Sequence, residues 1–171
     1  MLKNKTVNLA GIAYESLVNG EGIRRVFFAQ GCIHNCLGCF NKETHDFNGG
    51  IETSLDKLLE ELKENPIIKG VTFSGGDPFE QGEEFAYLST EIKKMPLSIW
   101  CYTGYTFEYI LMNLKTRKGW ELLINNIDVL VDGRFEEDKK EDNLKYRGSS
   151  NQRILNVKES LAKGESIIYM D

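Results

Sequence analysis

The feature that most limits the folds open to this chain is the alternation of short apolar segments with segments of helical periodicity. Leucines repeat at helical spacing from Leu55 to Leu62, for example, and a short apolar segment follows at 70–74. Strands that alternate with helices predict βαβ units and a parallel sheet. We predict strands at 7–12, 25–29, 70–74, 97–102 and 127–131, helices at 55–62 and 85–92, and a segment with helical signal at 107–124.

The length of the chain narrows this prediction. It has 171 residues, whereas a closed eight-stranded (β/α) barrel typically needs about 250. We therefore predict a single α/β domain over residues 1–171, built as a partial, open (β/α) barrel with mostly parallel strands. In such sheets, ligands bind at the carboxyl ends of the strands.

Charge and hydropathy exclude some classes of partner. Lysine and arginine number 21, and aspartate and glutamate number 26, so the formal net charge is −5. An acidic balance lacks the electrostatic footprint of a nucleic-acid or anionic-membrane protein, and we expect neither partner. The N-terminus is basic, but no long apolar run follows it. We therefore expect no signal peptide, no membrane span and a cytoplasmic location.

Three of the four cysteines form one cluster. Cys32, Cys36 and Cys39 stand in a C-x3-C-x2-C pattern within residues 31–41, which we call the cysteine loop. In a reducing compartment this spacing indicates a metal site rather than disulfides. Cys101 stands alone on a predicted strand, where a cysteine usually packs as a small hydrophobic side chain.

Two metal centres suit this loop. Three thiolates can bind three irons of a [4Fe–4S] cluster, which ordinarily takes four cysteines, so that one iron stays open for another ligand. Alternatively, the three cysteines and His45 are a possible tetrahedral zinc site. His34, which lies between two of the cysteines, is interpreted as a bystander.

A glycine motif follows the predicted strand at 70–74. Gly75 and Gly76 allow close approach of the backbone and positive φ values, Asp77 adds a carboxylate, and Pro78 stiffens the exit. Taken alone, this sequence is typical of a turn. Its place at the end of a strand also suits a ligand site.

The cysteine loop and the glycine motif together resemble the radical S-adenosylmethionine superfamily. That superfamily binds a [4Fe–4S] cluster with three cysteines, and its "GGE" motif contacts the amino group of S-adenosylmethionine. Here Asp77 replaces the glutamate, Gly38 replaces the usual aromatic residue before the last cysteine, and the aromatic residue follows as Phe40. The resemblance implies that Gly38, Phe40, Gly75, Gly76 and Asp77 contact the cofactor.

Three later segments narrow the resemblance. Residues 102–108, 128–135 and 147–153 resemble the activating enzymes of anaerobic ribonucleotide reductase, and the similarity runs from about residue 20 to residue 153. The resemblance implies an enzyme that removes a hydrogen atom from a glycine of the large reductase subunit and leaves a glycyl radical. It also implies a one-electron donor such as flavodoxin.

Several further residues have alternative interpretations. Asp132 is a candidate contact for the ribose hydroxyls or a turn carboxylate, and Arg134 a partner for the cofactor carboxylate, for the reductase or for a surface salt bridge. We expect Gly104 to relieve crowding at the end of the predicted strand at 97–102, near the cofactor. Residues 148–153 contact the partner or close the barrel mouth, and the charged segment 136–143 is a solvated, mobile loop.

Two other functions are consistent with the same residues. The first is an activating enzyme for another glycyl-radical enzyme, such as formate-lyase. The second belongs to a different class, a zinc-stabilised binding module without catalysis.

Overall fold

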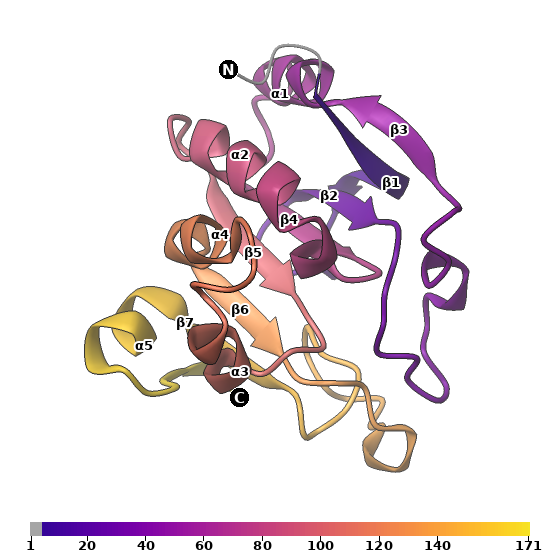
Figure 1. Ribbon diagram of the computed structural model, residues 1–171, viewed down its shortest axis with the longest axis vertical. Helices are drawn as coiled ribbons and strands as arrows, with labels where there is room; N and C mark the ends of the chain where they lie inside the picture. Colours follow the sequence, from indigo (N-terminus) through magenta and orange to yellow (C-terminus); the bar gives the residue numbers. More distant parts are fainter. Residues whose placement is uncertain (1–4) are drawn as a thin grey trace.

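The computed structural model describes residues 5–171, which form one eight-stranded sheet in the order β3-β1-β2-β4-β5-β6-β7-β8 (Figure 1). Residues 1–4, part of the basic N-terminus considered for a signal peptide, lie outside the described residues. The strands are β1 (Thr6–Ser16), β2 (Arg24–Ala29), β3 (Ile51–Ser54), β4 (Gly70–Gly75), β5 (Ser98–Tyr102), β6 (Val129–Asp132), β7 (Arg153–Asn156) and β8 (Ile168–Met170). The α-helices are α1 (Leu55–Lys63), α2 (Gly82–Ile92), α3 (Phe107–Met112), α4 (Trp120–Asn126) and α5 (Val157–Lys163).

The prediction of an open α/β sheet is confirmed, but the strands are not mostly parallel. Only the central strands β2, β4, β5 and β6 pair in parallel. Strands β1 and β3 on one side, and β7 and β8 on the other, pair antiparallel. A strand that pairs in parallel with its predecessor in the chain needs a crossover connection, which is usually a helix. The β1–β2 and β6–β7 connections contain no α-helix, and these two pairs of strands are antiparallel.

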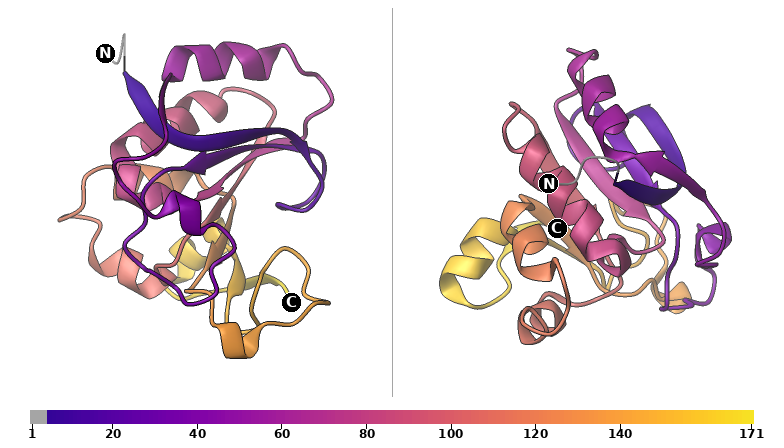
Figure 2. Two further views of the ribbon diagram at one scale, coloured as in Figure 1. Left: turned by 90° about the vertical axis from the view of Figure 1, so that its right-hand side faces the viewer. Right: turned by 45° about the horizontal axis from the view of Figure 1, so that its top comes forward.

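The helices cover one face of the sheet, as the two views of Figure 2 show. Alternate side chains of the central strands point to this face and pack with the helices in the main core, among them Phe27, Phe73, Ile99 and Leu130. Cys101 belongs to this core and is fully buried, which confirms its predicted packing role. The opposite face carries a smaller cluster around Trp100, and the functional cavity described below lies on that side.

A buried arginine ties the amino ends of the central strands together on the smaller-cluster face. The guanidinium of Arg24 donates five hydrogen bonds to neutral oxygens of Glu21, Val71, Thr72 and Ser98, at 2.8–3.0 Å. Burial lowers the pKa of Arg24 to about 10. The neutral oxygens surround the cation and satisfy its donors, which a buried charge requires.

The helical signal predicted at 107–124 is confirmed, and the structure divides the segment into two helices. Helix α3 ends at Met112 and α4 begins at Trp120. Between them Gly119 has φ +80°, and a Cβ at this position would lie 2.4 Å from the carbonyl carbon of Gly82. The chain therefore turns where only glycine fits against α2. Helix α1 is capped at its amino end by Ser54, whose hydroxyl accepts a hydrogen bond from the Lys57 amide.

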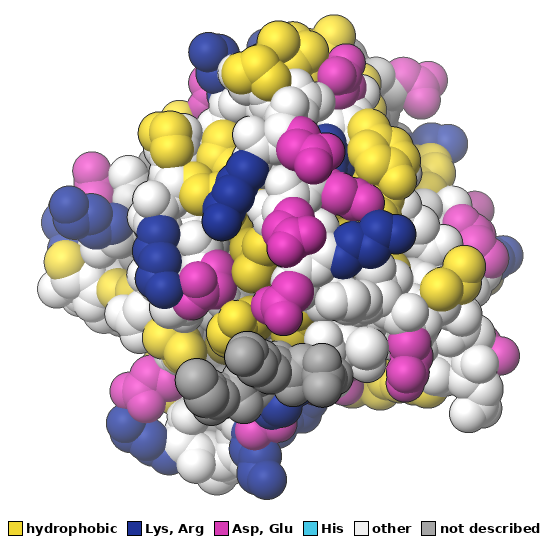
Figure 3. Space-filling model, turned by 90° about the horizontal axis from the view of Figure 1, so that it is seen from above, with side chains coloured by type: hydrophobic (Ala, Val, Ile, Leu, Met, Phe, Trp, Pro, Cys, Tyr) yellow, Lys and Arg dark blue, Asp and Glu magenta, His cyan; other side chains and the backbone are white. Residues whose placement is uncertain are grey.

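The molecular surface carries both acidic and basic side chains. On the face drawn in Figure 3, acidic and basic side chains are interspersed with apolar ones. No helix within residues 5–171 combines the length and apolar character that a membrane span would need.

Candidate cofactor site

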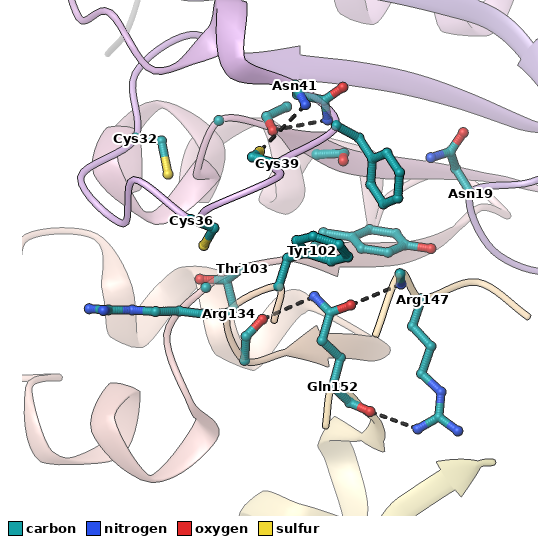
Figure 4. Close-up of a pocket in the computed structure, with 18 of the residues that line it drawn as sticks. Asn19, Cys32, Cys36, Cys39, Asn41, Tyr102, Thr103, Arg134, Arg147 and Gln152 are labelled. Atoms are coloured by element: carbon teal, nitrogen blue, oxygen red, sulfur yellow. Dashed lines mark hydrogen bonds between the residues drawn. The ribbon is translucent and has the colours of Figure 1, made fainter. Parts of the chain in front are cut away.

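A cavity of about 620 Å³ lies where the carboxyl ends of the parallel strands meet (Figure 4). Phe28, Ser74 and Tyr102 line it from the ends of β2, β4 and β5, and Gly133 lines it directly after β6. Its other walls come from the cysteine loop, the β1–β2 turn and the β6–β7 connection. Ligand cavities in proteins usually measure roughly 300–1,000 Å³, so this one is large enough for a cofactor.

All three cysteines of the cysteine loop line this cavity, and each is partly exposed. Burial raises the pKa of Cys32 to about 12. Burial also raises the pKa of Cys36, while a backbone hydrogen bond from Phe135 and the charge of Arg134 oppose the rise. Because thiolates rather than thiols bind metals, iron must displace these protons when it binds.

The donor set, three thiols that line one cavity, fits a [4Fe–4S] cluster. Within residues 5–171, no group of three or more His, Cys, Asp or Glu side chains is arranged to hold one metal ion. A zinc ion would gather its ligands to about 2.0–2.3 Å from one point, whereas a cubane cluster takes each thiolate at a separate iron. His45, the fourth ligand of the zinc hypothesis, lines the same cavity.

The two glycines of the glycine motif line the cavity and pack against the start of the cysteine loop. Gly75 has φ +107°, and a Cβ there would lie 2.4 Å from the Ala29 amide nitrogen; at Gly76 it would lie 2.4 Å from the Gly31 carbonyl oxygen. The Gly76 amide donates to the carbonyl oxygen of Ala29 at 2.9 Å. The close approach that requires glycine is therefore first of all to the protein's own backbone.

Asp77 does not line the cavity, which is at odds with its predicted contact to the cofactor amino group. Its carboxylate is fully buried and accepts hydrogen bonds from four groups: His34 Nε2 at 2.7 Å, the Thr103 hydroxyl at 2.8 Å, the Gly104 amide at 3.0 Å and the Phe79 amide at 3.0 Å. These donors are sufficient for a carboxylate, and the oxygens face the protein interior.

Asp132 likewise does not line the cavity, so direct contact with ribose hydroxyls has no support in the geometry. Its side chain is 1% exposed. One oxygen accepts from Arg153 Nε at 3.0 Å, and the other accepts from Arg153 Nη2 at 2.5 Å and from the Phe107 amide at 2.7 Å. The carboxylate therefore joins the end of β6 to the start of β7 and to the first turn of α3.

The aromatic residue after the last cysteine is Phe40, which lines the cavity and stays 62% exposed. Its ring centroid lies 5.0 Å from that of Phe135, and a Cβ at Gly148 would lie 2.9 Å from Cε2 of the Phe40 ring. Gly38, by contrast, is absent from the cavity lining: it has φ +74°, and a Cβ there would lie 2.8 Å from a carboxylate oxygen of Glu137. The structure thus gives Gly38 a packing role against the β6–β7 connection.

Residues 134–152, which we call the excursion, form one wall of the cavity. Its charged part is solvated as predicted, but its backbone is ordered by a 3-10 turn at Glu137–Lys139 and a bridge between Lys140 and Ser149. Gln152 clasps its two ends: its amide oxygen accepts from the amides of Gly148 and Ser149, and its amide nitrogen donates to the Gly133 carbonyl oxygen. Of the two roles predicted for residues 148–153, this geometry supports closing the cavity mouth.

Sequence reasoning missed two residues that join the cysteine loop to the glycine motif. His34, interpreted as a bystander, contacts Asp77, and the Asn41 side-chain amide donates to the Gly75 carbonyl oxygen at 3.3 Å. Their position in the cysteine loop was the signal available in the sequence, since each lies two residues from a predicted cysteine ligand. The crowding predicted at Gly104 is present, because a Cβ there would lie 2.4 Å from the His34 ring.

Comparisons with known proteins agree with this site. A family model described as a 4Fe-4S single cluster domain matches residues 18–155. An anaerobic ribonucleoside-triphosphate reductase-activating protein of Pasteurella multocida is 38% identical over 147 residues, which cover 81% of this chain and 90% of the relative. Proteins of the same name from Escherichia coli K12 and Enterobacteria phage T4 are 33% and 38% identical; the matches cover 83% and 80% of this chain and 94% and 86% of the relatives.

The matches to these relatives cover most of each chain, and the region that the family model matches contains the cysteine loop, the glycine motif and the excursion. The chain therefore belongs to the family of anaerobic ribonucleoside-triphosphate reductase-activating proteins.

Proposed function

We propose that this protein is the activating enzyme of an anaerobic ribonucleotide reductase. It would cleave S-adenosylmethionine reductively at a [4Fe–4S] cluster and remove a hydrogen atom from a glycine of the large reductase subunit. The observation that carries the proposal is that the three cysteines and the glycine motif line one cavity at the carboxyl ends of the parallel strands.

Cys32, Cys36 and Cys39 would hold the cluster, each at one iron. When bound and reduced, the cluster supplies one electron to the sulfonium of S-adenosylmethionine, whose cleavage gives methionine and a 5′-deoxyadenosyl radical that takes hydrogen from the target glycine. The protein's part is to place these groups and to keep water and stray hydrogen donors away. Phe28, Phe40 and Tyr102 give the cavity the apolar surface that this task needs.

The remaining polar groups of the cavity suit the methionine part of S-adenosylmethionine. Arg134 is an exposed residue of the cavity lining, and its charge lowers the pKa of Cys36. A carboxylate bound at the open iron would therefore find a cation beside it. Backbone groups of Gly75 and Gly76 offer contacts from the opposite wall, without a side chain in the way.

The open sheet suits a protein substrate, because the target hydrogen is on a backbone and a whole loop must enter. We propose that the sheet is a partial (β/α) barrel whose side opposite the helices admits that loop. Leu17 and Val18 at the β1–β2 turn line this side and are strongly exposed. The partner would be the large reductase subunit, and the electron would come from a small donor such as flavodoxin.

The first test is anaerobic reconstitution with iron and sulfide, followed by dithionite and S-adenosylmethionine, with products separated by chromatography. Methionine and 5′-deoxyadenosine should form with the natural chain and with Cys101→Ala, whose thiol is buried in the core. They should be lost with Cys36→Ala. A reconstituted chain that leaves S-adenosylmethionine intact would refute the proposal.

Two alternatives are separated by further measurements. Mixing the reduced enzyme with the reductase subunit or with formate-lyase, followed by electron paramagnetic resonance, identifies the partner that acquires a glycyl radical. A zinc-stabilised binding module would instead be colourless and indifferent to oxygen, whereas an iron–sulfur protein is brown and bleaches in air. The match to a 4Fe-4S family model favours the iron–sulfur protein.

A further inference from the structure

The buried pair formed by His34 and Asp77 joins the middle of the cysteine loop to the carboxyl end of β4. His34 lies midway between Cys32 and Cys36, and its side chain is 3% exposed. Its Nε2 lies 2.7 Å from Asp77 Oδ2, and its ring packs edge-on against Tyr105, with centroids 4.5 Å apart. The His34 side chain thus lines the cavity that the three cysteines line, and it is held there by a residue from the end of another strand.

The carboxylate that His34 meets is itself held from several directions. The Thr103 hydroxyl and the Gly104 amide, both directly after β5, donate to the same oxygen of Asp77, and the Phe79 amide donates to the other. Asp77 therefore connects the carboxyl ends of β4 and β5, and His34 fastens the cysteine loop to that junction.

We propose that His34 is a positioning residue: the hydrogen bond from its Nε2 to Asp77 sets the conformation of the cysteine loop, so that Cys32 and Cys36 are in place before the cluster binds. The consequence for the cluster rests on the proposed function, whereas the effect on the loop itself does not. Asp77 would act in this network rather than as a contact to S-adenosylmethionine.

The geometry assigns different roles to the two ring nitrogens. Because an ionised carboxylate only accepts hydrogen bonds, the nitrogen that faces Asp77 carries the hydrogen. The other nitrogen, Nδ1, is buried and has no hydrogen-bond partner among residues 5–171. Glutamine places its amide nitrogen about where Nε2 stands, and asparagine places its amide nitrogen about where Nδ1 stands. His34→Gln should therefore keep the anchoring bond, and His34→Asn should lose it.

The experiment compares hydrogen exchange in the full-length chain, without iron and under reducing, anaerobic conditions. Amides of the loop are held by bonds such as Cys32 N–H to the His45 carbonyl oxygen and Cys39 N–H to the Cys36 carbonyl oxygen. Losing a charge-assisted anchor should speed their exchange by roughly tenfold to a hundredfold in His34→Asn. His34→Gln should stay within about threefold of the natural chain, and helix α2 should be unchanged in both.

A second pair of variants consists of one substitution that should displace the unaltered His34 ring and one matched control. Gly104→Ala places a Cβ 2.4 Å from the His34 ring and should displace the ring from Asp77, so its exchange pattern should match that of His34→Asn. Gly11→Ala is the matched control, because nothing lies within 4 Å of its Cβ. This pair keeps the test informative if His34→Asn does not fold.

Iron and sulfide per chain after anaerobic reconstitution are the second readout, and both should fall in His34→Asn and recover in His34→Gln. The proposal is overturned if His34→Asn exchanges like the natural chain, or if His34→Gln is as impaired as His34→Asn, which would indicate ring packing instead of the hydrogen bond. Protection of the loop is measured without cofactor, so its result stands even if reductase activation fails.

Discussion

Replacing Asp132 by asparagine separates the two roles that this residue could have. In the structure the carboxylate accepts from Arg153 on both oxygens and from the Phe107 amide on one of them. An asparagine of the same shape keeps one acceptor and turns the other into a donor. Whichever way the amide is oriented, a donor then faces an N–H group in a buried site.

The size of the effect follows from these contacts. One hydrogen bond to a charged group is lost, which costs about 1.5–3 kcal/mol. Arg153 also loses its buried ionic partner, but it stays paired with Glu108 and its side chain is 30% exposed, so this adds at most about 1 kcal/mol. We expect Asp132→Asn to lower the free energy of unfolding by roughly 2–4 kcal/mol.

Urea unfolding of the reduced, iron-free chain measures this difference, with the fluorescence of the buried Trp100 and Trp120 as the signal. Glu108→Gln is the matched control, since Glu108 binds the same arginine but is 53% exposed, and it should cost less than about 1 kcal/mol. Unchanged stability of Asp132→Asn, combined with a tenfold or greater loss of S-adenosylmethionine affinity, would refute this reasoning and restore the ribose role.

Three other predictions follow from single contacts. The hydrogen bond from Arg153 lowers the pKa of Glu108 from its ordinary value, so the stability that this pair contributes is present above that value and is lost as pH falls through the lowered pKa. The deficit of Glu108→Gln in urea unfolding should therefore shrink as the solution is made more acidic, and a deficit that does not change with acidification would contradict the assignment. Gly75→Ala combines φ +107° with a Cβ 2.4 Å from the Ala29 nitrogen, so unfolding measurements should show a loss of roughly 2–6 kcal/mol, and a loss below about 1 kcal/mol would count against the geometry. Gln152→Ala should speed hydrogen exchange in the excursion at least about tenfold while leaving α2 unchanged, and equal rates would show that the clasp is dispensable.

The parts of the fold that could be predicted are those governed by local patterns. The central strands are short and apolar, and the helices between them carry clear apolar faces, so the sequence identifies both. The flanking strands were harder, because β3 and β8 are short and mostly exposed and do not show the apolar character of a buried strand. The break before α4 depends on how closely Gly119 approaches α2, which periodicity does not reveal.

The candidate site divides in the same way. The cysteines and Gly75 and Gly76 were found because their chemistry and spacing are local. The roles of Asp77 and Asp132 could not be derived, because their partners are distant in the chain: His34 is 43 residues from Asp77, and Arg153 is 21 residues from Asp132. A buried carboxylate takes whichever donors the fold supplies, and only the folded chain shows which donors those are.

The position of the excursion in the chain has a consequence for the timing of synthesis. Gln152, whose hydrogen bonds hold this wall together, is added 113 residues after Cys39. At ~5–20 residues per second, a growing chain carries its three thiols for roughly 5–20 s before this wall exists. The finished cavity is therefore available only after Gln152 has been added to the chain, long after the cysteine loop itself has been made.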